Sequence, residues 1–130
     1  MGLIGKRILV VEDEFLVAML IEDALTDAGC IVVGPFSRVP EARVAAEQHA
    51  VDFALLDVNV AGEKVFPVAE ALEARGIPFL FLTGYGAVAL PKDRPDWEAC
   101  AKPFDPGNLI ARLEQRSCIG AAMTPASREH

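Results

Sequence analysis

Apolar residues along this chain fall into five short runs, which are separated by longer stretches of mixed character. Most of these runs are rich in branched or aromatic side chains, which is typical of strands buried on both faces of a sheet. The expected strands are Ile8–Val11, Ile31–Val33, Phe53–Leu56, Ile77–Leu82 and a weaker one at Glu98–Ala101.

Between the runs, apolar residues recur at spacings of three and four, which places them on one face of a helix. Glycines end two of these patterns, and Asp105 and Pro106 have the residue types that begin a last helix. The expected helices are Leu16–Ala28, Glu41–His49, Val65–Arg75 and one that starts at Pro106. The segment Gly84–Asp96 contains two prolines and two glycines, so a helix there should be short or irregular.

Strands that alternate with helices pair in parallel through right-handed crossovers, which predicts an α/β fold. The expected architecture is a three-layer flavodoxin-like sandwich with a five-stranded parallel sheet in the order 2-1-3-4-5. A chain of 130 residues fits one domain. We expect that domain to span residues 1–116, with residues 117–130 as a flexible C-terminal tail because they are small and polar.

Composition narrows the class of protein. Apolar residues make up 52% of the chain, which excludes a disordered protein, and a net charge of −7 argues against direct binding to nucleic acid. The apolar runs are too short to span a membrane, and the N-terminus lacks the pattern of a signal peptide. The three cysteines are widely spaced, which does not suggest a zinc or redox site and fits a reducing cytoplasm.

Polar residues follow the predicted strands at the point where each strand ends. Glu12 and Asp13 follow the first strand, Asp57 the third, Thr83 the fourth and Lys102 the fifth. Each alone has an ordinary structural explanation, such as a helix cap, a turn residue or a solvated side chain. Because parallel strands end at the same edge of a sheet, where ligands bind in such folds, we expect these five to form one site.

The chemistry of this set is coherent. Three carboxylates placed together repel one another, and a hard divalent cation such as Mg²⁺ relieves that repulsion. A carboxylate is also a competent nucleophile toward phosphorus, which makes Asp57 a candidate acceptor of a phosphoryl group. Lys102 can neutralise the incoming charge, and Thr83 can donate a hydrogen bond to a phosphoryl oxygen.

These residues resemble the receiver domain of bacterial two-component response regulators, from about Lys6 to Arg116. The resemblance implies that Asp57 accepts a phosphoryl group from a histidine kinase or phosphotransfer protein. It also implies that Glu12, Asp13, Asp57 and the backbone carbonyl of Asn59 hold Mg²⁺, and that Thr83 and Lys102 contact the phosphoryl group. In this family the bond before the proline is cis, which is Lys102-Pro103 here.

The chain departs from the usual receiver pattern at two positions. Ala61 stands where a proline is usual, and Ala99 replaces the usual aromatic switch residue. Residues 81–86, FLTGYG, are instead similar to the motif of the FAT-GUY subfamily of stand-alone receivers. Because Ala99 has no ring that could move, Tyr85, two residues past Thr83 and between two glycines, is the expected output residue; the alternative is that it is only a surface aromatic. We expect a phosphoacceptor signalling protein rather than an enzyme, without a DNA-binding output domain, acting on an unknown downstream protein or as a phosphate sink.

Two alternatives remain open from the sequence. A small phosphatase of the haloacid-dehalogenase type also uses an aspartate after a strand, but it needs a second aspartate two residues on, where this chain has Asn59. Turnover of a small phosphate ester would favour it. A degenerate receiver would bind a partner without being phosphorylated, and a phosphoryl-donor assay in Mg²⁺ distinguishes it.

Overall fold

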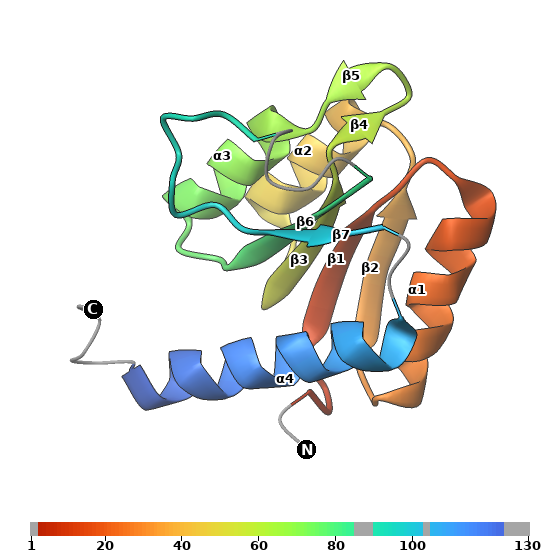
Figure 1. The fold of residues 1–130 in the computed structure, drawn as a ribbon, viewed down its shortest axis with the longest axis vertical. Helices are drawn as coiled ribbons and strands as arrows, with labels where there is room; N and C mark the ends of the chain where they lie inside the picture. The colour runs from red at the N-terminus through yellow and green to blue at the C-terminus, as the bar shows by residue number, and fades with distance from the viewer. Residues whose placement is uncertain (1–2, 85–89, 103–104, 124–130) are drawn as a thin grey trace.

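A five-stranded parallel sheet forms the centre of the molecule in the computed structural model, which describes residues 3–84, 90–102 and 105–123 (Figure 1). Its strands are β1 (Arg7–Val11), β2 (Ile31–Phe36), β3 (Phe53–Asp57), β6 (Phe79–Thr83) and β7 (Ala99–Ala101). They lie in the order β2-β1-β3-β6-β7. Counted within this sheet alone, that is the predicted order 2-1-3-4-5, so the predicted fold class is confirmed.

Helices cover both faces of the sheet (Figure 1). The helices α1 (Phe15–Asp27) and α4 (Pro106–Met123) lie on one face, and α2 (Val39–Gln48) and α3 (Phe66–Ala74) on the other. Alternate residues of β1 face opposite layers: Ile8 and Val10 pack in the core under α1 and α4, whereas Leu9 and Val11 pack in the core under α2 and α3. Burial on both faces explains why the strands are continuous apolar runs.

The second strand is longer than the sequence predicts. It was expected to end at Val33, before Gly34-Pro35, but β2 continues through both residues to Phe36. β2 is an edge strand of the sheet, where a proline does not remove a ladder hydrogen bond that the sheet needs.

The last helix is also longer than predicted. Residues from 117 were expected to form a flexible tail, but α4 continues to Met123. Ala121, Ala122 and Met123 are strong helix formers, which outweighs the small and polar character of this stretch. The domain limit at residue 116 stays a prediction.

A two-stranded hairpin that was not predicted follows the third strand of the main sheet. It consists of β4 (Asn59–Val60) and β5 (Glu63–Lys64), which pair in antiparallel fashion. Strands of two residues are too short to show an alternating pattern in the sequence. The hairpin begins two residues after Asp57 and lies at the end of the molecule where β1 and β3 end (Figure 1).

The connection from β6 to β7 contains no helix in its described part, residues 90–98, as expected from its prolines. Trp97 anchors this connection. It is buried, and its ring lies 5.2 to 5.8 Å from the rings of Phe66, Phe79 and Phe81. The connection is therefore packed on the core beside α3.

Arg94 adds polar contacts to this packing. Its guanidinium lies 4.8 Å from the centre of the Trp97 ring and 2.6 Å from a carboxylate oxygen of Glu73. We predict that Arg94→Ala lowers the free energy of unfolding by about 1 kcal/mol, the sum expected for a partly exposed ion pair and a cation–π contact. Urea denaturation followed by circular dichroism measures it.

The matched control is Arg112→Ala, because Arg112 makes a longer contact of 3.8 Å with Glu98. It should change stability by less than half as much. Equal losses for the two variants would contradict the anchoring role of Arg94.

Candidate functional site

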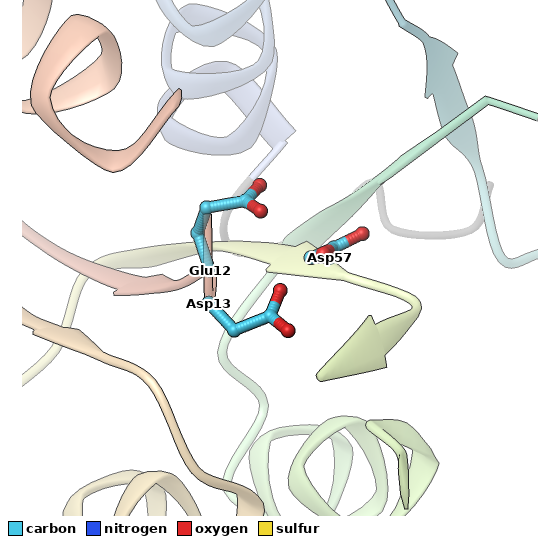
Figure 2. A group of neighbouring side chains, drawn as sticks. All are labelled: Glu12, Asp13 and Asp57. Atoms are coloured by element: carbon cyan, nitrogen blue, oxygen red, sulfur yellow. The ribbon is translucent and has the colours of Figure 1, made fainter. Parts of the chain in front are cut away.

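Three carboxylates meet at the carboxyl edge of the sheet (Figure 2). Glu12 and Asp13 follow the last residue of β1, and Asp57 is the last residue of β3. One oxygen from each of the three lies within 4.8 Å of the others. Glu12 and Asp57 are buried, whereas Asp13 is exposed, so the cluster opens to solvent on the Asp13 side.

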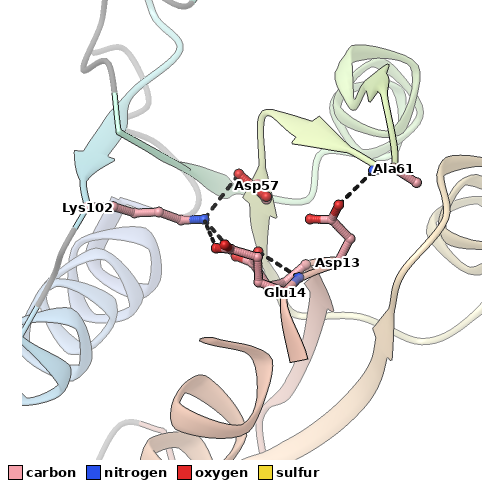
Figure 3. A network of polar contacts seen from close by, with 6 residues as sticks. Asp13, Glu14, Asp57, Ala61 and Lys102 are labelled. Carbon is pink, nitrogen blue, oxygen red and sulfur yellow. Dashed lines mark hydrogen bonds and ion pairs between the residues drawn. The ribbon is translucent and has the colours of Figure 1, made fainter. Parts of the chain in front are cut away.

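Lys102 brings a positive charge into this cluster from the end of β7 (Figure 3). Its Nζ lies 2.9 Å from Glu12 Oε1, 3.3 Å from Asp57 Oδ1 and 3.9 Å from Glu14 Oε1. Its backbone N–H donates to the carbonyl of Thr83, which ties the two strand ends together. One lysine faces more than one buried carboxylate, so the site keeps an excess of negative charge.

The electrostatics of the site show in two pKa values. Burial, followed by the charge of Glu12, raises the pKa of Asp57 from its ordinary 3.8 to about 7, although Lys102 opposes the change. Burial tends to lower the pKa of Lys102, but its hydrogen bond to Glu12 and the charges of Glu12 and Asp57 outweigh that effect and raise it. Lys102 is therefore charged at neutral pH, whereas Asp57 is held near the midpoint of its titration.

The structure brings together most of the residues predicted from the sequence. Thr83 is buried at the end of β6, one strand from Asp57, and Asn59 begins the β4–β5 hairpin close behind Asp57. Tyr85 and Pro103, the predicted output residue and cis proline, lie outside the described residues, and both remain predictions.

Two residues of the site were not predicted. Glu14 contributes a carboxylate beside Lys102, and the acidic run of residues 12–14 was its only signal. Ala61 donates its backbone N–H to Asp13 Oδ2 at 2.9 Å (Figure 3). Nothing in the sequence indicates that bond, because an alanine carries no functional group that draws attention to its main chain.

Comparison with known protein families identifies the chain. The family model described as the response regulator receiver domain matches residues 8–114. The chain belongs to this family. Receiver domains are signalling proteins of two-component systems, and the acidic cluster at the end of β1 and β3 is the place where the family binds Mg²⁺.

Individual relatives agree with this assignment. The phyllosphere-induced regulator PhyR of Methylorubrum extorquens is 31% identical over 115 residues, which are 85% of this chain and 43% of PhyR. The solution structure of SdrG from Sphingomonas melonis is 38% identical with a TM-score of 0.75, and the match covers 92% of this chain and 98% of SdrG.

A third relative bears on the metal. The receiver domain of a sensor histidine kinase from Pseudomonas aeruginosa, solved with a magnesium ion in its active-site cleft, is 28% identical with a TM-score of 0.70. The match covers 86% of this chain and 96% of that domain.

The chain spans about half the length of the curated relatives it matches, including PhyR. The similarity to the FAT-GUY subfamily rests on its motif and stays a prediction.

The residues present fit a hard divalent cation. Glu12, Asp13 and Asp57 offer oxygen ligands within reach of one another, and Lys102 leaves part of their charge uncompensated.

None of the helices in the described ranges is long and apolar enough to cross a membrane.

Proposed function

We propose that this receiver accepts a phosphoryl group on Asp57 from a histidine kinase or phosphotransfer protein, in a reaction that requires Mg²⁺. The observation that carries the proposal is the position of Asp57: its Oδ1 lies 3.3 Å from Lys102 Nζ in a cluster with Glu12 and Asp13. A candidate nucleophile, a positive charge and further carboxylate oxygens therefore lie close together at one edge of the sheet.

The chemistry assigned to Asp57 is a phosphoryl transfer. An oxygen of its carboxylate attacks phosphorus, a bond between that oxygen and phosphorus forms, and the bond from phosphorus to the donor nitrogen breaks. The imidazole of the donor histidine keeps the electron pair of that bond and takes up a proton. The product is an aspartyl phosphate on this chain.

The surrounding residues of the chain support each part of this step. Lys102 stabilises the ionised form of Asp57 and then the negative charge of the transferred group. Thr83, at the end of the neighbouring strand, is assigned to a phosphoryl oxygen. Glu12, Asp13, Asp57 and the carbonyl of Asn59 are assigned to Mg²⁺, which supplies positive charge to the phosphoryl oxygens when it is bound.

The phosphorylated chain is proposed to act by changing a protein–protein contact. Bartonella quintana PhyR, a relative 26% identical to this chain, is described as an anti-anti-sigma factor, which is an output through protein binding. We assign no DNA-binding or membrane role to this chain, place it in the cytoplasm, and keep Tyr85 as the proposed output residue. The alternative output is a phosphate sink: the chain would then accept phosphoryl groups and lose them without binding a downstream protein.

A small-molecule donor tests the acceptor role without a known kinase. We predict that the full chain, incubated with acetyl phosphate and Mg²⁺, gains the mass of one phosphoryl group, and that EDTA prevents the gain. Intact-protein mass spectrometry measures both. Release of free phosphate from many small esters without a phosphorylated protein would instead favour the phosphatase alternative.

A further inference from the structure

The turn of the β4–β5 hairpin has an unusual backbone. Ala61 and Gly62 form its two-residue connection, with φ values of 52° and 85°. Positive φ at both positions is the signature of a type I′ turn, which normally takes asparagine or aspartate followed by glycine. Among the residues that the structure describes, Ala61 is the one non-glycine residue with positive φ. Left-handed backbone is unfavourable for an alanine because its Cβ crowds the following carbonyl oxygen, so this turn needs a compensating contact.

The compensating contact is the hydrogen bond from the Ala61 N–H to Asp13 Oδ2, at 2.9 Å (Figure 3). A hydrogen bond to a charged acceptor is stronger than one between neutral groups, so this bond offsets part of the strain of the turn. The bond uses one of the two carboxylate oxygens of Asp13, and a carboxylate accepts at both. Asp13 can therefore hold the hairpin and bind a cation at the same time.

The same bond fixes the main chain around Asn59. The hairpin is attached at its base, where the Val65 N–H donates to the carbonyl of Val58 at 2.9 Å, and at its tip through Ala61. Asn59 lies between these two attachments. Fixing both Asp13 and this stretch of chain before a cation arrives lowers the ordering cost of binding it.

We propose that the backbone N–H of Ala61 is a positioning group, which arranges the Asp13 carboxylate and the β4–β5 hairpin to receive Mg²⁺. The inference rests on the proposed function of the site. Proline, the usual residue here in receivers, has no N–H and holds φ near −65°, so it cannot make this contact. This chain uses a main-chain hydrogen bond at a position where the common pattern has none.

Two substitutions at one position separate the hydrogen bond from the side chain. Ala61→Gly keeps the N–H and favours positive φ, whereas Ala61→Pro removes the N–H and excludes that φ. In calorimetric titrations of the full chain with MgCl₂, we expect Ala61→Gly to bind within about twofold of the wild type. Ala61→Pro should bind about tenfold more weakly, the effect of losing roughly one hydrogen bond. Circular dichroism reports whether each variant is folded.

Equal Mg²⁺ affinity of Ala61→Pro and wild type would overturn the inference, as would an Ala61→Gly variant as weak as Ala61→Pro. A wild-type protein that binds no Mg²⁺ would instead overturn the proposed function of the site. If Ala61→Pro fails to fold, amide exchange measured by NMR decides. The Ala61 amide should be protected in the wild type and lose that protection in Asp13→Ala; free exchange in the wild type would refute the contact.

Discussion

Replacing Asp57 with asparagine is expected to abolish phosphorylation of the chain by acetyl phosphate in Mg²⁺. The amide has nearly the shape of the carboxylate, but it lacks the negative oxygen that attacks phosphorus. Asp57 is the residue of the cluster that lies at the end of the central strand β3 and faces both Lys102 and Glu12. Intact-protein mass spectrometry should show one added phosphoryl group on the wild type and none on the variant.

The control for this experiment is Asp52→Asn, the same chemical change just before the opposite end of β3. Asp52 Oδ2 accepts a hydrogen bond from the Arg7 N–H at 2.8 Å, so this carboxylate has a structural contact away from the strand edge that carries the site. Asp52→Asn should be phosphorylated to the same extent as the wild type. Full labelling of Asp57→Asn would refute the assignment of the acceptor.

Asp57→Asn should also stabilise the metal-free protein, and the gain in the free energy of unfolding should depend on pH. The native pKa of Asp57 is about 7, against an ordinary value of 3.8, so the folded state binds this proton more tightly than the unfolded state. The contribution of Asp57 to stability is therefore largest at a pH below its pKa in the unfolded chain. It is lost as pH rises from about 4 to about 7. Above pH 7 the loss stays constant, because Asp57 is ionised in both states.

Asparagine carries no charge at any pH and avoids this loss. In EDTA, the stability of Asp57→Asn relative to the wild type should rise by roughly 2–3 kcal/mol between pH 5 and pH 8, since each unit of pKa difference corresponds to about 1.4 kcal/mol. Adding Mg²⁺ should reduce the gain, because the cation relieves the same repulsion and stabilises the wild type by binding to it.

Urea denaturation of both proteins at the two pH values measures the effect, and other titrating groups cancel in the comparison to first order. A variant less stable than the wild type at pH 8 in EDTA would contradict the account. So would a difference between the two proteins that is the same at pH 5 and pH 8.

The main features of the site were predictable because they follow from strand topology. Once the runs at Ile8 and Phe53 are taken as parallel neighbours, Glu12, Asp13 and Asp57 must end at one edge, and the structure places them there. The position of Lys102 could be predicted by the same rule, although the sequence signal for the strand before it is weak. The order of the sheet places β7 next to β6, so Lys102 comes to the same edge.

Features that depend on tertiary contacts could not be predicted. The left-handed alanine at position 61 is held by a carboxylate 48 positions earlier in the chain, and no local pattern encodes that pair. Trp97 was not recognised as a core residue, because it stands in a stretch of prolines and charges and meets its aromatic partners only when β6 and α3 are in place. The length of α4 was missed because Gly120 and the polar residues after Met123 gave the whole C-terminal stretch the composition of a tail.

Reduction of the phosphorylated protein with borohydride shows whether Asp57 itself carries the phosphoryl group. Borohydride converts an aspartyl phosphate into homoserine and leaves free carboxylates unchanged, so peptide sequencing by mass spectrometry then identifies the residue. We expect homoserine at position 57 and at no other aspartate. Homoserine at Asp13 or elsewhere, or none in a protein whose mass shows one phosphoryl group, would contradict it.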